Sequence, residues 1–247
     1  MIVLARAAFN HCKTWKAIAA AMLVAACESH SPVPYAPQGI TWPGTETVSR
    51  LPYGLSLRPM DFYLDFLREE RFNAIRLPIA HQSVLDDAPV TVGQFDPRLN
   101  PHLLDPESEP GDRDGGLLYQ DAILALAKRA ATRHMLVVIS GHRLKATHPN
   151  YGLWYNNSLG VSEESSSRSW EQLADVLCSQ WNVVGVDLMQ EAYALSWAEW
   201  HMAATTIGDR VLQKCPRWLI FVQGTGGNAP PTEPGMQPGE NLLGAGV

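Results

Sequence analysis

The stretch Val183-Val184-Gly185-Val186-Asp187-Leu188-Met189-Gln190-Glu191 begins as an apolar, β-branched run and ends on an amide and a carboxylate. Continuous apolar runs of this kind are typical of buried parallel strands. A second run, Trp218–Val222, follows one predicted helix later and stops at Gln223-Gly224. In α/β barrels the reactive groups lie where such strands end. We therefore expect Glu191 at the mouth of a barrel, directed at a ligand.

Strand and helix patterns alternate along the rest of the chain, which predicts a parallel sheet with right-handed crossovers. Gly and Pro punctuation predicts a long loop over residues 86–116. A serine run at 165–167 is expected to cap one helix, and Ser196 with Glu199 has capping-box spacing at the start of another. The helix capped by the serine run reaches residue 179, the other predicted helices are 58–71 and 117–133, and the other predicted strands are 39–42, 73–78 and 135–139.

Composition restricts the class of protein. The 247 residues are 46% hydrophobic, which is enough for a sizeable core. The net charge is −6 and the Lys and Arg residues are scattered, so we expect no nucleic-acid partner. No Gly-x-Gly-x-x-Gly follows the first strand, and the glycines of 224–228 lack the lysine of a phosphate-binding loop.

The N-terminus has the pattern of a targeting segment. Lys13 and Lys16 precede the apolar stretch 17–26, whose 10 residues are too few to span a bilayer. We interpret residues 1–27 as a signal segment and 28–38 as a Pro-rich linker, which predicts a secreted protein with no transmembrane span. Two alternatives stay open: lipid anchoring at Cys27, or an Ala-rich helix of the mature chain.

Two cysteines lie beyond this segment, each just upstream of one of the apolar runs. Cys178 and Cys215 should therefore lie near the same end of neighbouring strands, and in an oxidising compartment they can pair. Two buried free thiols are the alternative. Their spacing has no metal-site character, and the histidines show no ligand spacing either, so no metal site is assigned.

Several segments, taken in order, resemble the catalytic domain of retaining glycoside hydrolases of family 5, the cellulase family. The stretch 184–192 is similar to the strand-four motif, Ile75-Arg76-Leu77-Pro78 to the strand-two motif, and Ser140-Gly141-His142-Arg143 to the end of strand three. Segments 39–47, 153–155, 218–224 and 241–245 add to the likeness, which covers 39–247. The fold implied is a TIM (β/α)8 barrel.

The resemblance implies roles for individual residues. Glu191 would be the general acid/base, and Arg76 would hydrogen-bond a partner carboxylate and hold it ionised. His142 would contact a sugar hydroxyl, Gln190 would stand at the amide position beside the acid, and Trp154 would belong to the sugar-binding surface. The reaction implied is endo-β-1,4-glucanase hydrolysis of a β-linked polysaccharide or oligosaccharide, with two carboxyl groups about 5–5.5 Å apart and no metal or organic cofactor.

Structural alternatives stand beside these roles. Glu191 can be a carboxylate paired under a loop, Arg76 a rim ion-pair residue, and His142 a satisfied core histidine. Trp154 and Trp197 can be packing residues, and packing is what we expect of Trp200, which lies inside a predicted helix.

The chain departs from the family pattern at several points. Gln190 replaces an asparagine, Ala192 a proline and Gln223 a glutamate. The family's nucleophile comes from strand seven, and the only acidic residues after the fifth predicted strand, Glu233 and Glu240, lie in loop-like sequence.

We therefore expect an incomplete barrel of about five parallel strands with helices, open rather than closed, with its first and fifth strands as free edges. A truncated gene product, an incomplete gene model and a piece that needs another chain are the three explanations considered. Little hydrolysis is expected from these residues alone. A non-catalytic carbohydrate-binding pseudo-enzyme, an inactive fragment and another barrel hydrolase such as a mannanase are the alternative functions.

Overall fold

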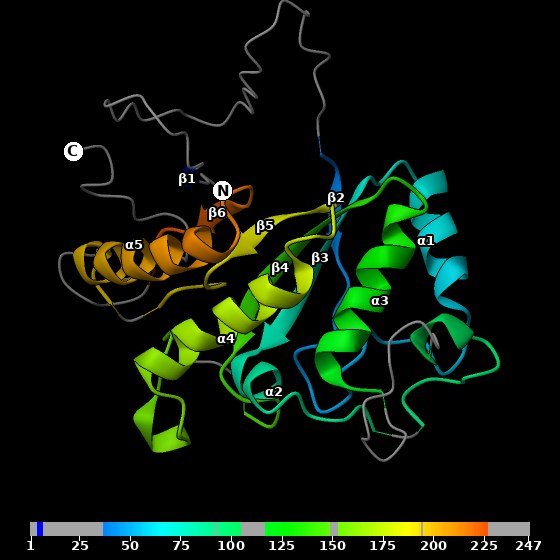
Figure 1. Ribbon diagram of the computed structural model, residues 1–247, viewed down its shortest axis with the longest axis horizontal. Helices are drawn as coiled ribbons and strands as arrows, with labels where there is room; N and C mark the ends of the chain where they lie inside the picture. The colour runs from blue at the N-terminus through cyan, green and yellow to red at the C-terminus, as the bar shows by residue number, and fades with distance from the viewer. Residues whose placement is uncertain are drawn as a thin grey trace, which may run out of the picture.

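The computed structural model describes residues 4–6, 37–91, 93–104, 117–148, 153–193 and 195–226 (Figure 1). Its centre is a six-stranded sheet in the order β1-β6-β5-β4-β3-β2, in which all neighbours from β2 to β6 are parallel. The predicted five parallel strands in an open sheet are thereby confirmed. The parallel strands are β2 (Gly39–Thr41), β3 (Ala74–Ala80), β4 (Leu136–Arg143), β5 (Val183–Asp187) and β6 (Leu219–Val222).

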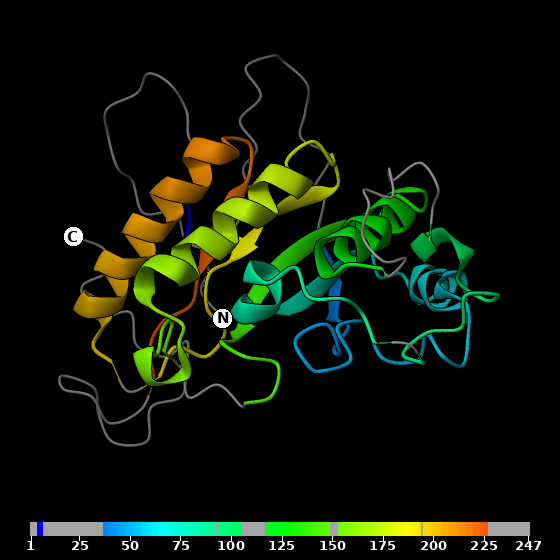
Figure 2. The ribbon, with the colours of Figure 1, turned by 60° about the horizontal axis from the view of Figure 1, so that its bottom comes forward.

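Helices cover one face of this sheet, and α3, α4 and α5 lie as a row along it (Figure 2). The row of paired residues Leu77, Ile139, Val186 and Ile220 runs across four strands, and each is at most 3% exposed. The described helices are α1 (Met60–Glu69), α2 (His81–Leu85), η1 (Pro101–Leu104), α3 (Tyr119–Ala131), η2 (Asn157–Leu159), α4 (Glu163–Leu177) and α5 (Trp197–Lys214).

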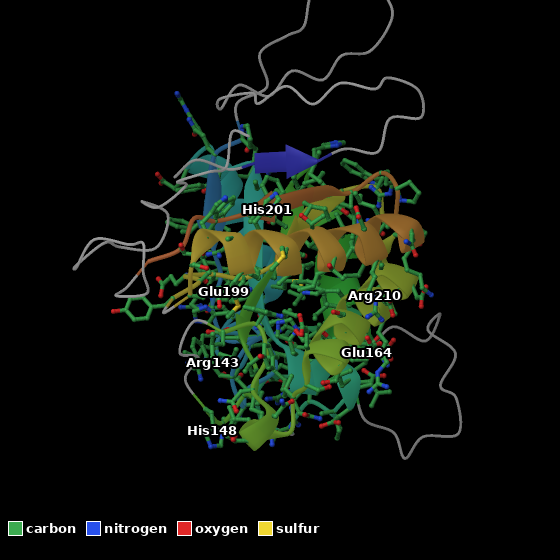
Figure 3. The ribbon with its side chains drawn as sticks, turned by 90° about the vertical axis from the view of Figure 1, so that its left-hand side faces the viewer. Arg143, His148, Glu164, Glu199, His201 and Arg210 are labelled. Carbon is green, nitrogen blue, oxygen red and sulfur yellow. A yellow bond between two sulfur atoms is a disulfide. The ribbon has the colours of Figure 1, made fainter. Side chains whose placement is uncertain are left out.

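The largest fully buried side chains of the core are tryptophans. Trp170, Trp200 and Trp218 are fully buried, so packing is the role of Trp200, as the sequence predicted. Between the two C-terminal helices, the Arg210 guanidinium donates to Glu164 at 2.6 and 2.8 Å and to Glu171 at 2.6 Å (Figure 3). These carboxylates raise the pKa of Arg210.

The helix starts test the capping predictions. At α5 both halves of the capping box are present: Ser196 Oγ accepts from the Glu199 amide at 3.3 Å, and Glu199 accepts from the Ser196 amide at 2.9 Å. At α4 the prediction was wrong, because Ser162 is the N-cap and accepts from the Ser165 amide at 3.1 Å. The serine run lies inside the first turns of the helix, where Ser166 is buried and cannot serve as a solvent-exposed cap.

The predicted loop over 86–116 begins directly after a short helix, α2, which the pattern did not indicate, and it holds the 3₁₀ turn η1. Residues 92 and 105–116 of this loop lie outside the described ranges. One further expectation is corrected. The edge of β6 is not free, because β1 (Leu4–Arg6) pairs antiparallel with it. Of the proposed signal segment and linker, residues 7–36 lie outside the described part of the chain, as does Cys27. No helix in the described ranges is long and apolar enough to cross a membrane.

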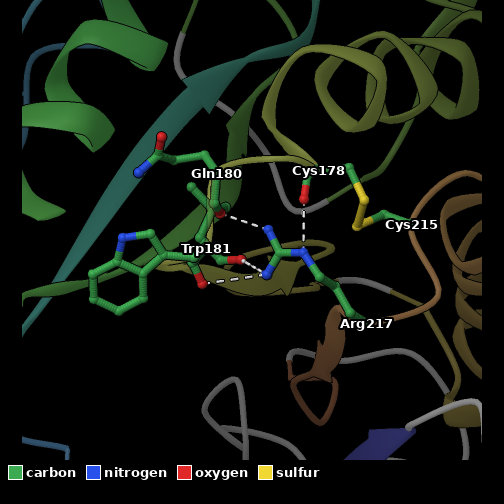
Figure 4. Close-up of a disulfide and its surroundings, with 6 residues drawn as sticks. Cys178, Gln180, Trp181, Cys215 and Arg217 are labelled. Carbon is green, nitrogen blue, oxygen red and sulfur yellow. Dashed lines mark hydrogen bonds between the residues drawn. A yellow bond between two sulfur atoms is a disulfide. The ribbon is translucent and has the colours of Figure 1, made fainter.

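The predicted disulfide between Cys178 and Cys215 is confirmed (Figure 4). It joins the C-caps of α4 and α5, which are 37 residues apart in sequence. Beside it, Arg217 donates to the carbonyl oxygens of Cys178 at 2.7 Å, Gln180 at 2.5 Å and Trp181 at 3.3 Å. The covalent link and the guanidinium together fix the chain where α4 ends and β5 begins.

We predict that the disulfide contributes about 3–4 kcal/mol to the free energy of unfolding, because it closes a loop of intermediate length in the unfolded chain. Urea unfolding of the protein with and without a thiol reductant measures the difference. The double variant Cys178→Ala/Cys215→Ala is the control and should be insensitive to reductant. Equal urea midpoints for the oxidised and reduced protein would contradict the prediction.

Candidate active site

Asp187, the last residue of β5, is the centre of a hydrogen-bonded cluster at the carboxyl edge of the sheet. One of its carboxylate oxygens, Oδ2, accepts from Arg76 Nη2 at 2.6 Å, Ser140 Oγ at 3.1 Å and Gln223 Nε2 at 2.9 Å. These partners come from β3, β4 and the residue after β6, so one carboxylate at the end of β5 links four neighbouring strands. Asp187 itself is only 5% exposed.

Glu191 lies in the turn that follows β5. The backbone amide of Gln190 donates to the Gly141 carbonyl at 2.8 Å, and that of Glu191 donates to Gln223 Oε1 at 3.3 Å. Glu191 has a φ of +56°, a left-handed conformation that residues with a side chain adopt at a cost of about 1–2 kcal/mol. Its side chain is exposed, as a group that must reach a ligand should be.

The turn approaches the sheet closely because residue 141 is glycine. A Cβ at this position would lie 2.6 Å from the Leu188 carbonyl oxygen and 3.2 Å from His81 Nε2. Gly141 therefore permits the turn that carries Glu191 to pack directly on the end of β4.

His142 is a half-buried histidine surrounded by charges from several elements. Burial lowers its pKa most; Arg143 and Arg76 also lower it, whereas Glu46 and Glu191 act in the opposite direction. The net result is a lowered pKa, so the imidazole is neutral at pH 7 and can both donate and accept a hydrogen bond.

The structure brings most of the predicted site residues to one edge. His142, Gln190 and Glu191 lie at or just beyond the ends of β4 and β5, and Arg76, which lies inside β3, reaches Asp187 at the end of β5 through its side chain. The only carboxylate that Arg76 contacts within the described residues is Asp187, and its predicted role toward a catalytic carboxylate stays a prediction.

Trp154 lies in the loop before α4. Its ring is 5.1 Å from that of Tyr155 and 5.6 Å from that of Trp200, and its Nε1 donates to Glu163 at 3.2 Å. Trp200 connects this aromatic group to the site, because its Nε1 donates to the carbonyl of Gln223, a residue that also binds Asp187, at 3.0 Å.

Sequence reasoning missed the support beneath the site. His81 is 1% exposed, its Nδ1 is 2.7 Å from Ser169 Oγ, and it packs edge-on against Trp170. Because Ser169 Oγ donates to the Ser166 carbonyl, the His81 Nδ1 must carry the proton. Burial lowers the pKa of His81 to about 4. A histidine three residues after the predicted strand 73–78 was the available signal.

Asp187 was also missed, although it lies inside the motif that decided the fold. The pairing of Ser140, Asp187 and Phe221 places these residues in one row across the sheet. Within the described ranges there is no group of three His, Cys, Asp or Glu residues that could hold a metal ion.

Comparison with known proteins finds a family model that matches the chain. The family model described as cellulase, glycosyl hydrolase family 5, matches residues 33–243. An endoglucanase of Paenibacillus polymyxa is 30% identical over 217 residues, covering 83% of this chain and 50% of that protein.

Solved structures give the same picture. An endocellulase of Pyrococcus horikoshii in complex with cellotetraose has a TM-score of 0.67 and 27% identity, covering 80% of this chain and 53% of that chain. The catalytic domain of the major endoglucanase of Xanthomonas campestris pv. campestris, at 24% identity and a TM-score of 0.68, shows the shared fold, covering 83% of this chain and 57% of that chain.

We predict that Arg76→Met destabilises the protein by about 3–5 kcal/mol, because it leaves the Asp187 carboxylate buried without its cation. Asp187→Asn in the same background should recover part of the loss by removing the uncompensated charge. Urea unfolding followed by tryptophan fluorescence measures both effects.

The matched control is Arg98→Met, which breaks an ion pair between Arg98 and Asp96 in which the arginine side chain is 90% exposed. An exposed pair is worth at most about 1 kcal/mol. Equal losses for Arg76→Met and Arg98→Met would show that Asp187 does not depend on Arg76.

Proposed function

Because the chain belongs to glycosyl hydrolase family 5, the cellulase family, we propose that it carries the acid/base half of a site that hydrolyses β-1,4-linked glucans with retention of configuration. The chain spans about half the length of the relatives it matches, with 50% of the Paenibacillus endoglucanase covered. The activity and the substrate are therefore both part of the proposal.

One observation carries it: an exposed carboxylate, Glu191, is held on a hydrogen-bonded turn at the carboxyl edge of a parallel sheet, with His142 near the end of β4 and Arg76 of β3 bound to Asp187. A proton donor to a glycosidic oxygen must be both accessible and fixed in position. Glu191 meets both conditions, and the neutral His142 is suited to a sugar hydroxyl.

Retention requires a second carboxylate, which attacks the anomeric carbon while the first protonates the departing oxygen. Two other carboxylates belong to the surroundings of Glu191 and His142. Asp187 precedes Glu191 by four residues, and Glu46 acts on the pKa of His142. Each is only 5% exposed. Neither can reach a sugar ring from such a position, so we place the nucleophile outside the described residues. Glu233 and Glu240 also lie outside them.

Substrate class and compartment follow from the relatives and from the disulfide. The Pyrococcus endocellulase was solved with cellotetraose, which supports a β-1,4-glucan chain as the ligand here. The disulfide supports an oxidising, extracellular location. Secretion through residues 1–27 and lipid anchoring at Cys27 are the two routes we propose.

We predict that azide can act as the nucleophile. In its presence the protein should cleave methylumbelliferyl cellobioside, because azide attacks the anomeric carbon, the aryl oxygen leaves with the proton of Glu191, and an inverted glycosyl azide forms. Fluorescence release and mass spectrometry of the azide adduct measure the reaction. Rapid turnover without azide that is lost in Glu191→Gln would show that the second carboxylate is already in this chain.

The leaving group provides the control. Glu191→Gln should lower the azide-dependent rate on methylumbelliferyl cellobioside by about 100-fold or more, the usual contribution of a general acid. The same variant should change the rate on dinitrophenyl cellobioside little, because dinitrophenolate leaves without a proton. No azide-dependent turnover on either substrate would refute the catalytic proposal.

A carbohydrate-binding protein without catalysis is the second candidate, and the aromatic group around Trp154 favours it. We predict that Trp154→Ala weakens binding to a soluble β-glucan, because the indole face stacks on sugar rings. Affinity gel electrophoresis in hydroxyethylcellulose measures the retardation, and exposed Trp181→Ala, at the opposite end of the sheet, is the control. Retardation without azide-dependent cleavage identifies a binder, and the absence of both identifies an inactive fragment.

A further inference from the structure

Gln223 makes side-chain contacts with both parts of the proposed site. Its Nε2 donates to Asp187 Oδ2 at 2.9 Å, and its Oε1 accepts from the backbone amide of Glu191 at 3.3 Å. Its backbone carbonyl accepts from Trp200 Nε1 at 3.0 Å, which anchors the residue itself to α5. One side chain therefore spans the gap between a buried carboxylate and the turn that carries the proton donor.

The two ends of this span require opposite polarity. The Asp187 carboxylate offers only acceptors, and the Glu191 amide offers only a donor. A primary amide of this length supplies a donor to one and an acceptor to the other, and this pairing also fixes which way the amide is turned. A glutamate of the same shape would present an acceptor to both.

The backbone at Glu191 needs such a restraint. Its φ of +56° lies in the left-handed region, which side-chain-bearing residues leave unless the surroundings hold them there. On either side, the Gln190 amide is bonded to Gly141 at 2.8 Å and the Ala192 carbonyl accepts from Gly226 at 2.9 Å. Between these two bonds, Gln223 Oε1 is the acceptor for the amide of Glu191 itself.

We propose that Gln223 is a positioning residue that holds Glu191 in its left-handed conformation and ties it to the Asp187–Arg76 pair. Gln223 thus connects the proton donor Glu191 to the same buried carboxylate, Asp187, that binds Arg76. The catalytic consequence rests on the proposed function, whereas the conformational claim stands on the contacts alone.

The conformational claim is tested with glycine at position 191. Glycine adopts positive φ without steric cost, so Glu191→Gly should raise the melting temperature of the otherwise unchanged protein. In a Gln223→Met background, where residue 191 is free to relax, the same substitution should give no rise. Equal increases in the two backgrounds would overturn the proposal, whether or not the protein has any activity.

The isosteric variant Gln223→Glu gives a second test. The titratable and charged groups of the site are Arg76 from β3, His142 and Arg143 from β4, Asp187 and Glu191 from β5 and its turn, and Glu46. The new carboxyl would face Asp187 Oδ2, so it must hold a proton to keep the contact, and its pKa would be raised above the usual value for glutamate, about 4.3.

A raised folded-state pKa means that the folded protein binds more protons than the unfolded chain. Gln223→Glu should therefore come closest to the unchanged protein at low pH and fall behind it as the pH rises through the raised pKa. Melting temperatures between pH 4 and pH 8 measure the gap. Parallel curves for the two proteins would show that Gln223 Nε2 does not contact Asp187 in solution.

The effect of Gln223 on catalysis is tested by comparing kcat on the two aryl cellobiosides. Gln223→Met should lower the azide-dependent kcat on methylumbelliferyl cellobioside with little change in KM, and leave dinitrophenyl cellobioside almost unaffected, because only the first needs a positioned proton. Equal losses on both substrates would indicate a merely structural role. If the unchanged protein shows no azide-dependent turnover, the proposed function fails, and the two melting experiments still decide the role of Gln223.

Discussion

A buried negative charge at the end of β5 is the constraint on which the arrangement of the site depends. Removing a carboxylate from water costs several kcal/mol unless cations and donors replace the solvent. In Asp187 the three donors Arg76, Ser140 and Gln223 all bind Oδ2. Its other oxygen, Oδ1, is buried with no hydrogen-bond partner among the described residues. Displacing any of the three donors would leave the charge less compensated, so the ends of the strands must keep their relative positions.

The same constraint extends to the turn after β5. β5 can end in a sharp turn because Gly141 leaves room for the Leu188 carbonyl. In this turn the amide of Gln190 donates to Gly141, and the amide of Glu191 donates to Gln223. Backbone strain at Glu191 is thus compensated by bonds to two neighbouring strand ends. Such strain is usually found where a side chain must point in one direction for function. An exposed carboxylate on a restrained backbone fits that pattern.

Local patterns predicted the parallel strands, the capping box of α5 and the position of Glu191 at the sheet edge, because apolar periodicity and cap spacing act over a few residues. Strand adjacency, which is encoded in element order, predicted the proximity of Cys178 and Cys215 and left pairing and two free thiols open; the structure shows the disulfide. The Ser162 cap, helix α2 and the contacts of Asp187 did not follow, because each depends on which neighbours the tertiary fold supplies. In the sequence, Asp187 is only a charged residue within an apolar strand, and its role becomes evident once its pairing with Ser140 is known.

The contacts of Arg76 show why a structural and a catalytic role need not compete. A guanidinium carries five N–H donors in a planar fork, and the bond to Asp187 at 2.6 Å engages Nη2 alone. The arginine side chain keeps 24% of its surface exposed, against 7% for that of its partner. Asp187 thereby holds one nitrogen of the guanidinium while part of the arginine side chain stays exposed. A second carboxylate that arrived at this edge would meet an arginine already held in place, with little side-chain entropy left to lose.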